Sequence, residues 1–113
     1  MNDVLPRSVS RPIHTPDGEA LGLSNRWQGG QYCAILTKAG LVGCGIYDLG
    51  VADEFRMAFA LAKGTPEKPL VEPEDLLPAR IVKVSARARN LGIQEGMSGA
   101  EALRILLAES SRL

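Results

Sequence analysis

The sequence predicts an α+β fold in which an N-terminal antiparallel β-meander is followed by helices and one further strand. Three observations predict it: short β-type segments separated by turn residues from 13 to 48, a helical spacing of apolar residues after Asp48, and a helix-capping motif at residues 98–101. With 113 residues, of which 45% are apolar, the chain fits one domain. We expect a single α+β domain over residues 13–113, preceded by a flexible N-terminal arm over residues 1–12, which shows no sustained period.

Three turn signals divide residues 13–48 into four expected strands: Thr15-Pro16-Asp17-Gly18-Glu19, Gln28-Gly29-Gly30 and Lys38-Ala39-Gly40. In the first, a three-residue loop at 16–18 pairs Thr15 with Glu19 and places Ile13 opposite Leu21 and His14 opposite Ala20.

The third turn decides how the two cysteines lie. A three-residue loop at 38–40 sets Cys33 opposite Gly45 and Cys44 opposite Ala34, so the two sulfurs lie on opposite faces of the sheet. One additional loop residue would bring them together. Because glycine at the last loop position favours the first geometry, we predict free thiols.

After Asp48 the apolar residues recur at helical spacing, which predicts a helix from Val51 to Ala62 that ends at Lys63-Gly64. A surface loop over 64–72 follows, then one helical turn at 73–77, a strand at 80–84 and a short helix capped by Ser85. Ser98 and Glu101 form a capping box at the start of the last helix.

Charge and composition exclude several classes of function. Thirteen Lys and Arg balance thirteen Asp and Glu, so no global field attracts nucleic acid, and a nucleic-acid partner is not expected. The longest glycine-free apolar run, residues 57–62, is far shorter than the roughly 20 residues that span a bilayer, so no membrane partner is expected. The first residues do not resemble an export signal, which predicts a cytoplasmic protein. Two cysteines and one histidine cannot form a four-ligand zinc site, and we predict neither metal nor cofactor.

The segment Leu41–Asp48 carries the first candidate site. Alternation leaves Gly43 and Gly45 on one strand face without side chains, which indicates close approach by a ligand, a helix or the backbone of another subunit. Cys44 between them is a candidate nucleophile, with His14 as its base and Asp48 as the group that orients the base. The alternative is a cysteine that packs as a small hydrophobe. Because Asp48 lies about 13 Å from Cys44 along an extended strand, geometry favours packing.

The segment Gly96-Met97-Ser98-Gly99 carries the second candidate site. Free amides at the start of the last helix can bind a carboxylate or phosphate, so Gly96, Ser98 and Gly99 join Gly43 and Gly45 as candidate ligand-binding residues. The alternative is ordinary capping by Ser98, with Gly96 in a turn of positive φ.

Together, Gly40-Leu41-Val42-Gly43-Cys44-Gly45-Ile46-Tyr47-Asp48 and the segment from Leu91 to Leu103, L-G-I-Q-E-G-M-S-G-A-E-A-L, resemble the small bacterial and archaeal proteins grouped as domain of unknown function 1805. The resemblance implies an α+β fold whose N-terminal β region assembles a tetramer, with no established activity. We therefore expect a homo-oligomeric cytoplasmic binding or regulatory domain whose main partner is itself and whose small-molecule ligand is not identified. The alternative is a small enzyme with an active site centred on Cys44 between subunits.

Overall fold

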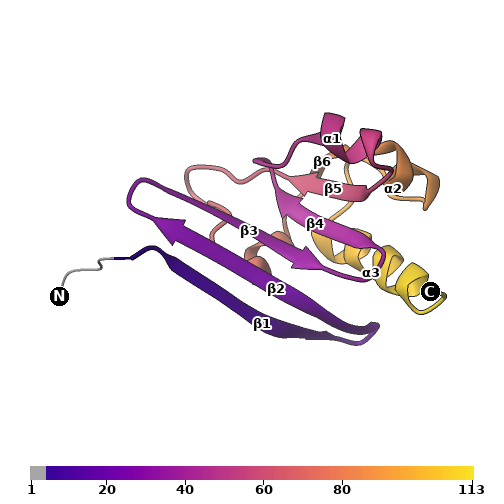
Figure 1. Ribbon diagram of the computed structural model, residues 1–113, viewed down its shortest axis with the longest axis horizontal. Helices are drawn as coiled ribbons and strands as arrows, with labels where there is room; N and C mark the ends of the chain where they lie inside the picture. The colour runs from indigo at the N-terminus through magenta and orange to yellow at the C-terminus, as the bar shows by residue number, and fades with distance from the viewer. Residues whose placement is uncertain (1–4) are drawn as a thin grey trace.

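The computed structural model describes residues 5–113 and contains one mixed sheet in the order β1-β2-β3-β4-β5-β6 (Figure 1). Strands β1 to β4 are antiparallel, β5 lies parallel to β4, and β6 is antiparallel to β5. The expected α+β class is confirmed. The strands are β1 (Arg7–Thr15), β2 (Gly18–Trp27), β3 (Gly30–Leu36), β4 (Gly40–Cys44), β5 (Ala58–Ala62) and β6 (Ile81–Val84); the helices are α1 (Leu49–Glu54), the 3-10 turn η1 (Pro73–Leu76), α2 (Ala86–Asn90) and α3 (Gly99–Ser110).

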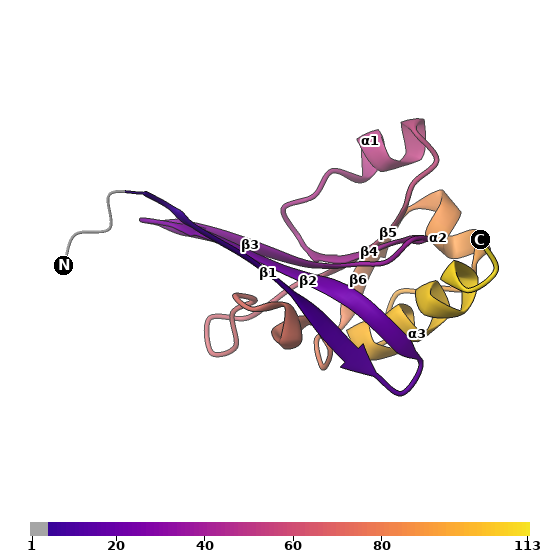
Figure 2. The ribbon, with the colours of Figure 1, turned by 60° about the horizontal axis from the view of Figure 1, so that its bottom comes forward.

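Helices lie on both sides of the sheet but leave part of it uncovered. Figure 2 shows η1 and α3 on one side, and α1 on the other side near β5. The core fills the first side with aliphatic residues from the sheet, η1 and α3, including Ile35, Val42, Leu76, Leu103 and Leu106. Among residues 5–113, no helix is long and apolar enough to cross a membrane.

The first strand begins earlier than expected. Residues 7–12, which we assigned to the flexible arm, pair with β2 from Arg7, opposite Arg26, to Pro12, opposite Leu21. Proline did not prevent this pairing because β1 is an edge strand, where a missing N–H is tolerated. Residues 1–4 of the expected arm lie outside the described residues.

The β1–β2 register predicted from the sequence was wrong by one residue. The loop contains two residues, so Thr15 pairs with Gly18, Ile13 lies opposite Ala20, and His14 lies opposite Glu19. The hydroxyl of Thr15 accepts a hydrogen bond from the Asp17 amide and donates one to the Gly18 carbonyl. Gly18 adopts a φ of +135°, which is why the tighter loop closes at this position.

The β3–β4 register was wrong for the same reason. The amide of Thr37 donates to the Gly40 carbonyl, which leaves only two residues in the loop. Ala34 therefore pairs with Gly43, and continuing this register by one position sets Cys33 opposite Cys44. The two sulfurs lie on the same face, contrary to expectation, and both thiols are free.

The helix expected over residues 51–62 was correct only in its first part. Helix α1 ends at Glu54, Arg56 adopts a positive φ of 59°, and residues 58–62 form β5. Four residues of β5 are almost completely buried: Ala58, Ala60, Leu61 and Ala62. A strand buried on both faces lacks the alternation that distinguishes it from a buried helix.

The later elements agree with prediction. A helical turn occupies 73–76, and Ser85 caps α2. The strand expected at 80–84 is present as β6. The hydroxyl of Ser98 accepts from the Glu101 amide, and the Glu101 carboxylate accepts from the Ser98 amide. The predicted capping box is therefore confirmed.

Candidate functional site

Cys44 is the last residue of β4 and faces Cys33 of β3 within the core. Its residue is 8% exposed, whereas Cys33 is fully buried. A hydrogen bond from the Cys33 thiol lowers the pKa of Cys44 to about 6, although burial opposes the change and the Ile46 amide assists it. The pKa of Cys33 is raised because this thiol donates the bond and is buried. The partner of Cys44 is thus a second thiol.

Neither predicted helper of Cys44 is placed to assist it within the chain. The Asp48 carboxylate caps α1 by accepting from the amides of Gly50, at 2.7 Å, and Val51, at 3.4 Å. His14 lies on β1, which is three strands away from β4, so the two strands are about 14 Å apart. The Nδ1 atom of His14 is 2.6 Å from a carboxylate oxygen of Glu19. The sequence-predicted trio is therefore not assembled in one protomer.

The two glycines around Cys44 have different surroundings. A Cβ at Gly43 would lie 2.7 Å from the ring of Tyr47, so the chain itself fills the space left by the missing side chain. A Cβ at Gly45 would meet only the Ala62 carbonyl oxygen, at 3.7 Å. Close approach is therefore observed at Gly43, where the approaching group is an aromatic ring of the same chain.

The amides at the start of α3 are already used. Gly96, at a φ of +97°, donates to the Ile81 carbonyl, Gly99 donates to Ala79, and the Glu101 amide donates to the Ser98 hydroxyl. The Glu101 carboxylate occupies the position an external anion would take. The capping alternative therefore describes Gly96, Ser98 and Gly99 in this chain.

A row of aromatic rings is the feature that sequence analysis missed. Neighbouring ring centroids are separated by 6.0 Å from Trp27 to Tyr32, 6.2 Å from Tyr32 to Tyr47, and 5.9 Å from Tyr47 to Phe59. These four are all the aromatic residues except Phe55. The row crosses the sheet from β2 to β5 on the side opposite η1. In the sequence, the alternation of Leu21, Leu23, Asn25 and Trp27 indicates one face of a strand. Only the strand register shows that the row starting at Trp27 on this face continues to the aromatic rings of β3 and β5.

We call the uncovered surface of β1–β3 the open face. Pairing and alternation assign to this side Ser8, Ser10, Pro12, His14, Glu19, Leu21, Leu23, Asn25, Trp27, Tyr32, Leu36 and Ala34, of which Ala34 is fully buried. Among these positions Glu19 is the acidic side chain and His14 the basic one, and they pair with each other at one end. The remainder of the open face is therefore an uncharged, largely apolar surface.

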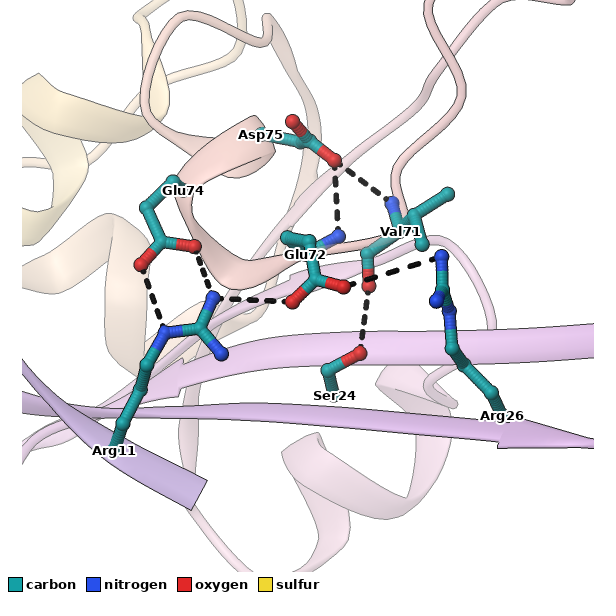
Figure 3. A network of polar contacts seen from close by, with 7 residues as sticks. All are labelled: Arg11, Ser24, Arg26, Val71, Glu72, Glu74 and Asp75. Atoms are coloured by element: carbon teal, nitrogen blue, oxygen red, sulfur yellow. Dashed lines mark hydrogen bonds and ion pairs between the residues drawn. The ribbon is translucent and has the colours of Figure 1, made fainter. Parts of the chain in front are cut away.

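The opposite surface of the same hairpin is strongly charged. Figure 3 shows Arg11 of β1 bound to the carboxylates of Glu72 and Glu74, with Arg26 3.9 Å from Glu72. Ser24 donates to the Val71 carbonyl at 3.0 Å. These contacts attach the segment that enters η1 to β1 and β2, so the acidic cluster acts as a structural clamp. Within residues 5–113, no group of His, Cys, Asp and Glu side chains is arranged to hold a metal ion.

The fold and the glycine-cysteine strand define a small α+β protein of the class that the sequence resembles. The family model described as "Domain of unknown function (DUF1805)" matches residues 43–106, more than half of the chain. The chain belongs to this family, as its motifs indicated.

The fold also matches the crystal structure of TA1206, a protein of unknown function from Thermoplasma acidophilum, with a TM-score of 0.77 and 18% identity. The match covers 89% of this chain and 94% of that chain, so it extends beyond the family segment into the N-terminal strands. At this identity the likeness establishes the fold alone. A search of curated proteins found no match.

Proposed function

We propose that this chain is a self-associating binding or regulatory domain of the cytoplasm, whose copies meet through the open face. The observation that carries the proposal is the uncharged surface of the open face, on which Trp27 is 46% exposed and Leu21 41% exposed beside the partly buried Tyr32. Protein interfaces are depleted in charge at their centre and enriched in tyrosine, tryptophan and phenylalanine. Within the described part of this chain the fully buried core contains no aromatic residue, Tyr32 and Tyr47 pack against its edge, and Trp27 extends the aromatic row onto the exposed surface.

Contact through the face is favoured over contact through the edge of β1. Pro12 lies in the edge strand and has no N–H to donate. Arg7 and Arg11, also in β1, place charge beside the same edge. Both features oppose strand addition, whereas nothing comparable protects Leu21 or Trp27.

A second copy is the partner that the charges favour. In a two-fold contact, the same patch lies on both sides, so an uncharged surface meets an uncharged surface. The His14–Glu19 pair at one end places a basic side chain beside an acidic one and is compatible with its own copy. A tetramer, the assembly that the family resemblance implies, requires a further contact between such dimers.

The experiment is sedimentation velocity at micromolar concentration on the wild type and two matched variants. Leu21→Asp places a charge on the open face, and Val82→Asp places one on β6, away from that face. The two positions are similarly accessible, because Leu21 is 41% exposed and Val82 is 39% exposed. We expect a wild-type assembly larger than the 12.1 kDa monomer, which Leu21→Asp dissociates and Val82→Asp preserves. A monomeric wild type, or equal dissociation by both variants, would contradict the proposal.

The second candidate is an enzyme centred on Cys44, which the lowered pKa of that thiol favours. A subunit interface would have to supply a base, because His14 is paired with Glu19 and Asp48 caps α1. The two candidates can be separated without measuring an enzymatic activity, because the first requires assembly and the second requires a reactive thiol.

A further inference from the structure

The two cysteines occupy facing positions on neighbouring strands. Continuing the β3–β4 register by one position places Cys33 of β3 opposite Cys44 of β4, and both side chains belong to the buried core. Directly opposed residues of an antiparallel pair have Cα atoms about 4.5 to 5.5 Å apart. This separation lies inside the range of roughly 4.4 to 6.8 Å over which a disulfide closes. At this register the typical Cα separation is therefore compatible with a disulfide.

The two thiols differ in access. Cys33 is fully enclosed, whereas Cys44 ends its strand and keeps a small exposed area. The next two residues, Gly45 and Ile46, are exposed, so the surface begins directly after Cys44. Of the two cysteines, Cys44 is therefore the one nearer to the surface.

We propose that Cys44 and Cys33 form a dithiol redox site that exchanges with small organic disulfides, with Cys44 as the attacking thiol and Cys33 as the resolving thiol. The proposal rests on the pairing of two strands within one chain and is independent of self-association. The difference in exposure between the two cysteines is the observation that assigns the two roles.

The exchange proceeds in two displacements that conserve atoms and electrons. The Cys44 thiolate attacks one sulfur of a disulfide RSSR; the bond from Cys44 to SR forms, the S–S bond breaks, and RS⁻ leaves and takes up the proton Cys44 released. Cys33 then loses its proton and attacks the Cys44 sulfur, which expels the second RS⁻ as RSH. The protein is oxidised by two electrons, and RSSR is reduced to two RSH.

The test uses the full-length reduced protein and the disulfide of β-mercaptoethanol as probe, with intact-mass and peptide mapping as readouts. We expect the wild type to lose two hydrogens and to yield a Cys33–Cys44 cross-linked peptide. Cys33→Ala should stop at a single adduct on Cys44, and Cys44→Ala should leave Cys33 unmodified. Circular dichroism verifies that each variant is folded.

A second measurement needs no variant. On the native wild type near neutral pH, we expect an alkylating reagent to modify Cys44 at least about tenfold faster than Cys33. Absence of reaction at both thiols under native conditions would overturn the proposal, as would adducts on both cysteines without a cross-link. Equal alkylation rates would overturn the assignment of attacking and resolving roles.

Discussion

A single added methyl group at Gly99 tests how the last helix is docked. A Cβ at this position would lie 1.8 Å from the carbonyl oxygen of Leu76 and 2.8 Å from its carbonyl carbon. Both atoms belong to backbone, so no side-chain rotation relieves the overlap. Leu76 is fully buried, so its segment cannot move outward without exposing core. Gly99→Ala therefore has to displace α3 from η1.

The magnitude follows from the contacts that such a displacement loses. Overpacking a core position costs about 1 to 3 kcal/mol. Separation of α3 from η1 also strains the hydrogen bond from the Gly99 amide to Ala79 and that from Ala100 to Leu77, each worth about 1 kcal/mol. The higher helix propensity of alanine returns at most about 1 kcal/mol. We expect a net loss of about 3 kcal/mol in the free energy of unfolding, and a melting temperature lower by about 15 °C.

The assay is urea denaturation followed by far-UV circular dichroism, with Gly45→Ala as the matched control. Gly45 has ordinary φ, and its added Cβ would meet a single atom at van der Waals distance, so this variant should differ from wild type by less than about 1 kcal/mol. The reasoning is refuted if Gly99→Ala is as stable as wild type. Equal destabilisation by both variants would mean that the two glycines are not distinguished by the contacts described.

Three further outcomes are expected from smaller changes. Ser85→Ala removes a fully buried hydroxyl that donates to the Met57 carbonyl, and should cost about 2 kcal/mol in urea denaturation. Ser98→Ala removes the α3 cap and should cost about 1 kcal/mol in the same assay. Arg11→Ala breaks a solvent-exposed clamp and should lower the free energy of unfolding only slightly at neutral pH. Because Arg11 lowers the pKa of Glu74, this stabilisation exists above the ordinary carboxyl pKa and should disappear as pH falls through the lowered one, which denaturation at pH 7 and pH 3 would measure.

Elements defined by local hydrogen bonds were predictable from the sequence. Ser85 and Ser98 cap helices through atoms within three residues, so the residue types alone locate the helix starts. The positions of the turns were likewise correct, because they depend on glycine and proline. Elements defined by burial were not predictable: residues 58–62 acquire their strand conformation from β4 and β6 on either side.

The prediction of the candidate site was wrong because the predicted strand register was wrong. Two turns were each expected to contain three residues and contain two, and one residue is enough to exchange the faces of a strand. That error separated Cys33 from Cys44 and hid the thiol pair. The error at residues 58–62 hid the end of the aromatic row, because Phe59 approaches Tyr47 only when it lies on a strand beside β4.

The two proposals concern opposite surfaces of the same strands and can be separated by experiment. Tyr32 and Cys33 are neighbours in β3, and alternation directs one to the open face and the other to the core. If the surfaces act independently, Leu21→Asp dissociates the assembly without changing the ratio of alkylation rates at Cys44 and Cys33. Conversely, Cys33→Ala blocks cross-linking without changing the sedimentation coefficient. A variant that altered both readouts while remaining folded would show that β3 transmits strain between its faces, and the site would then include the interface.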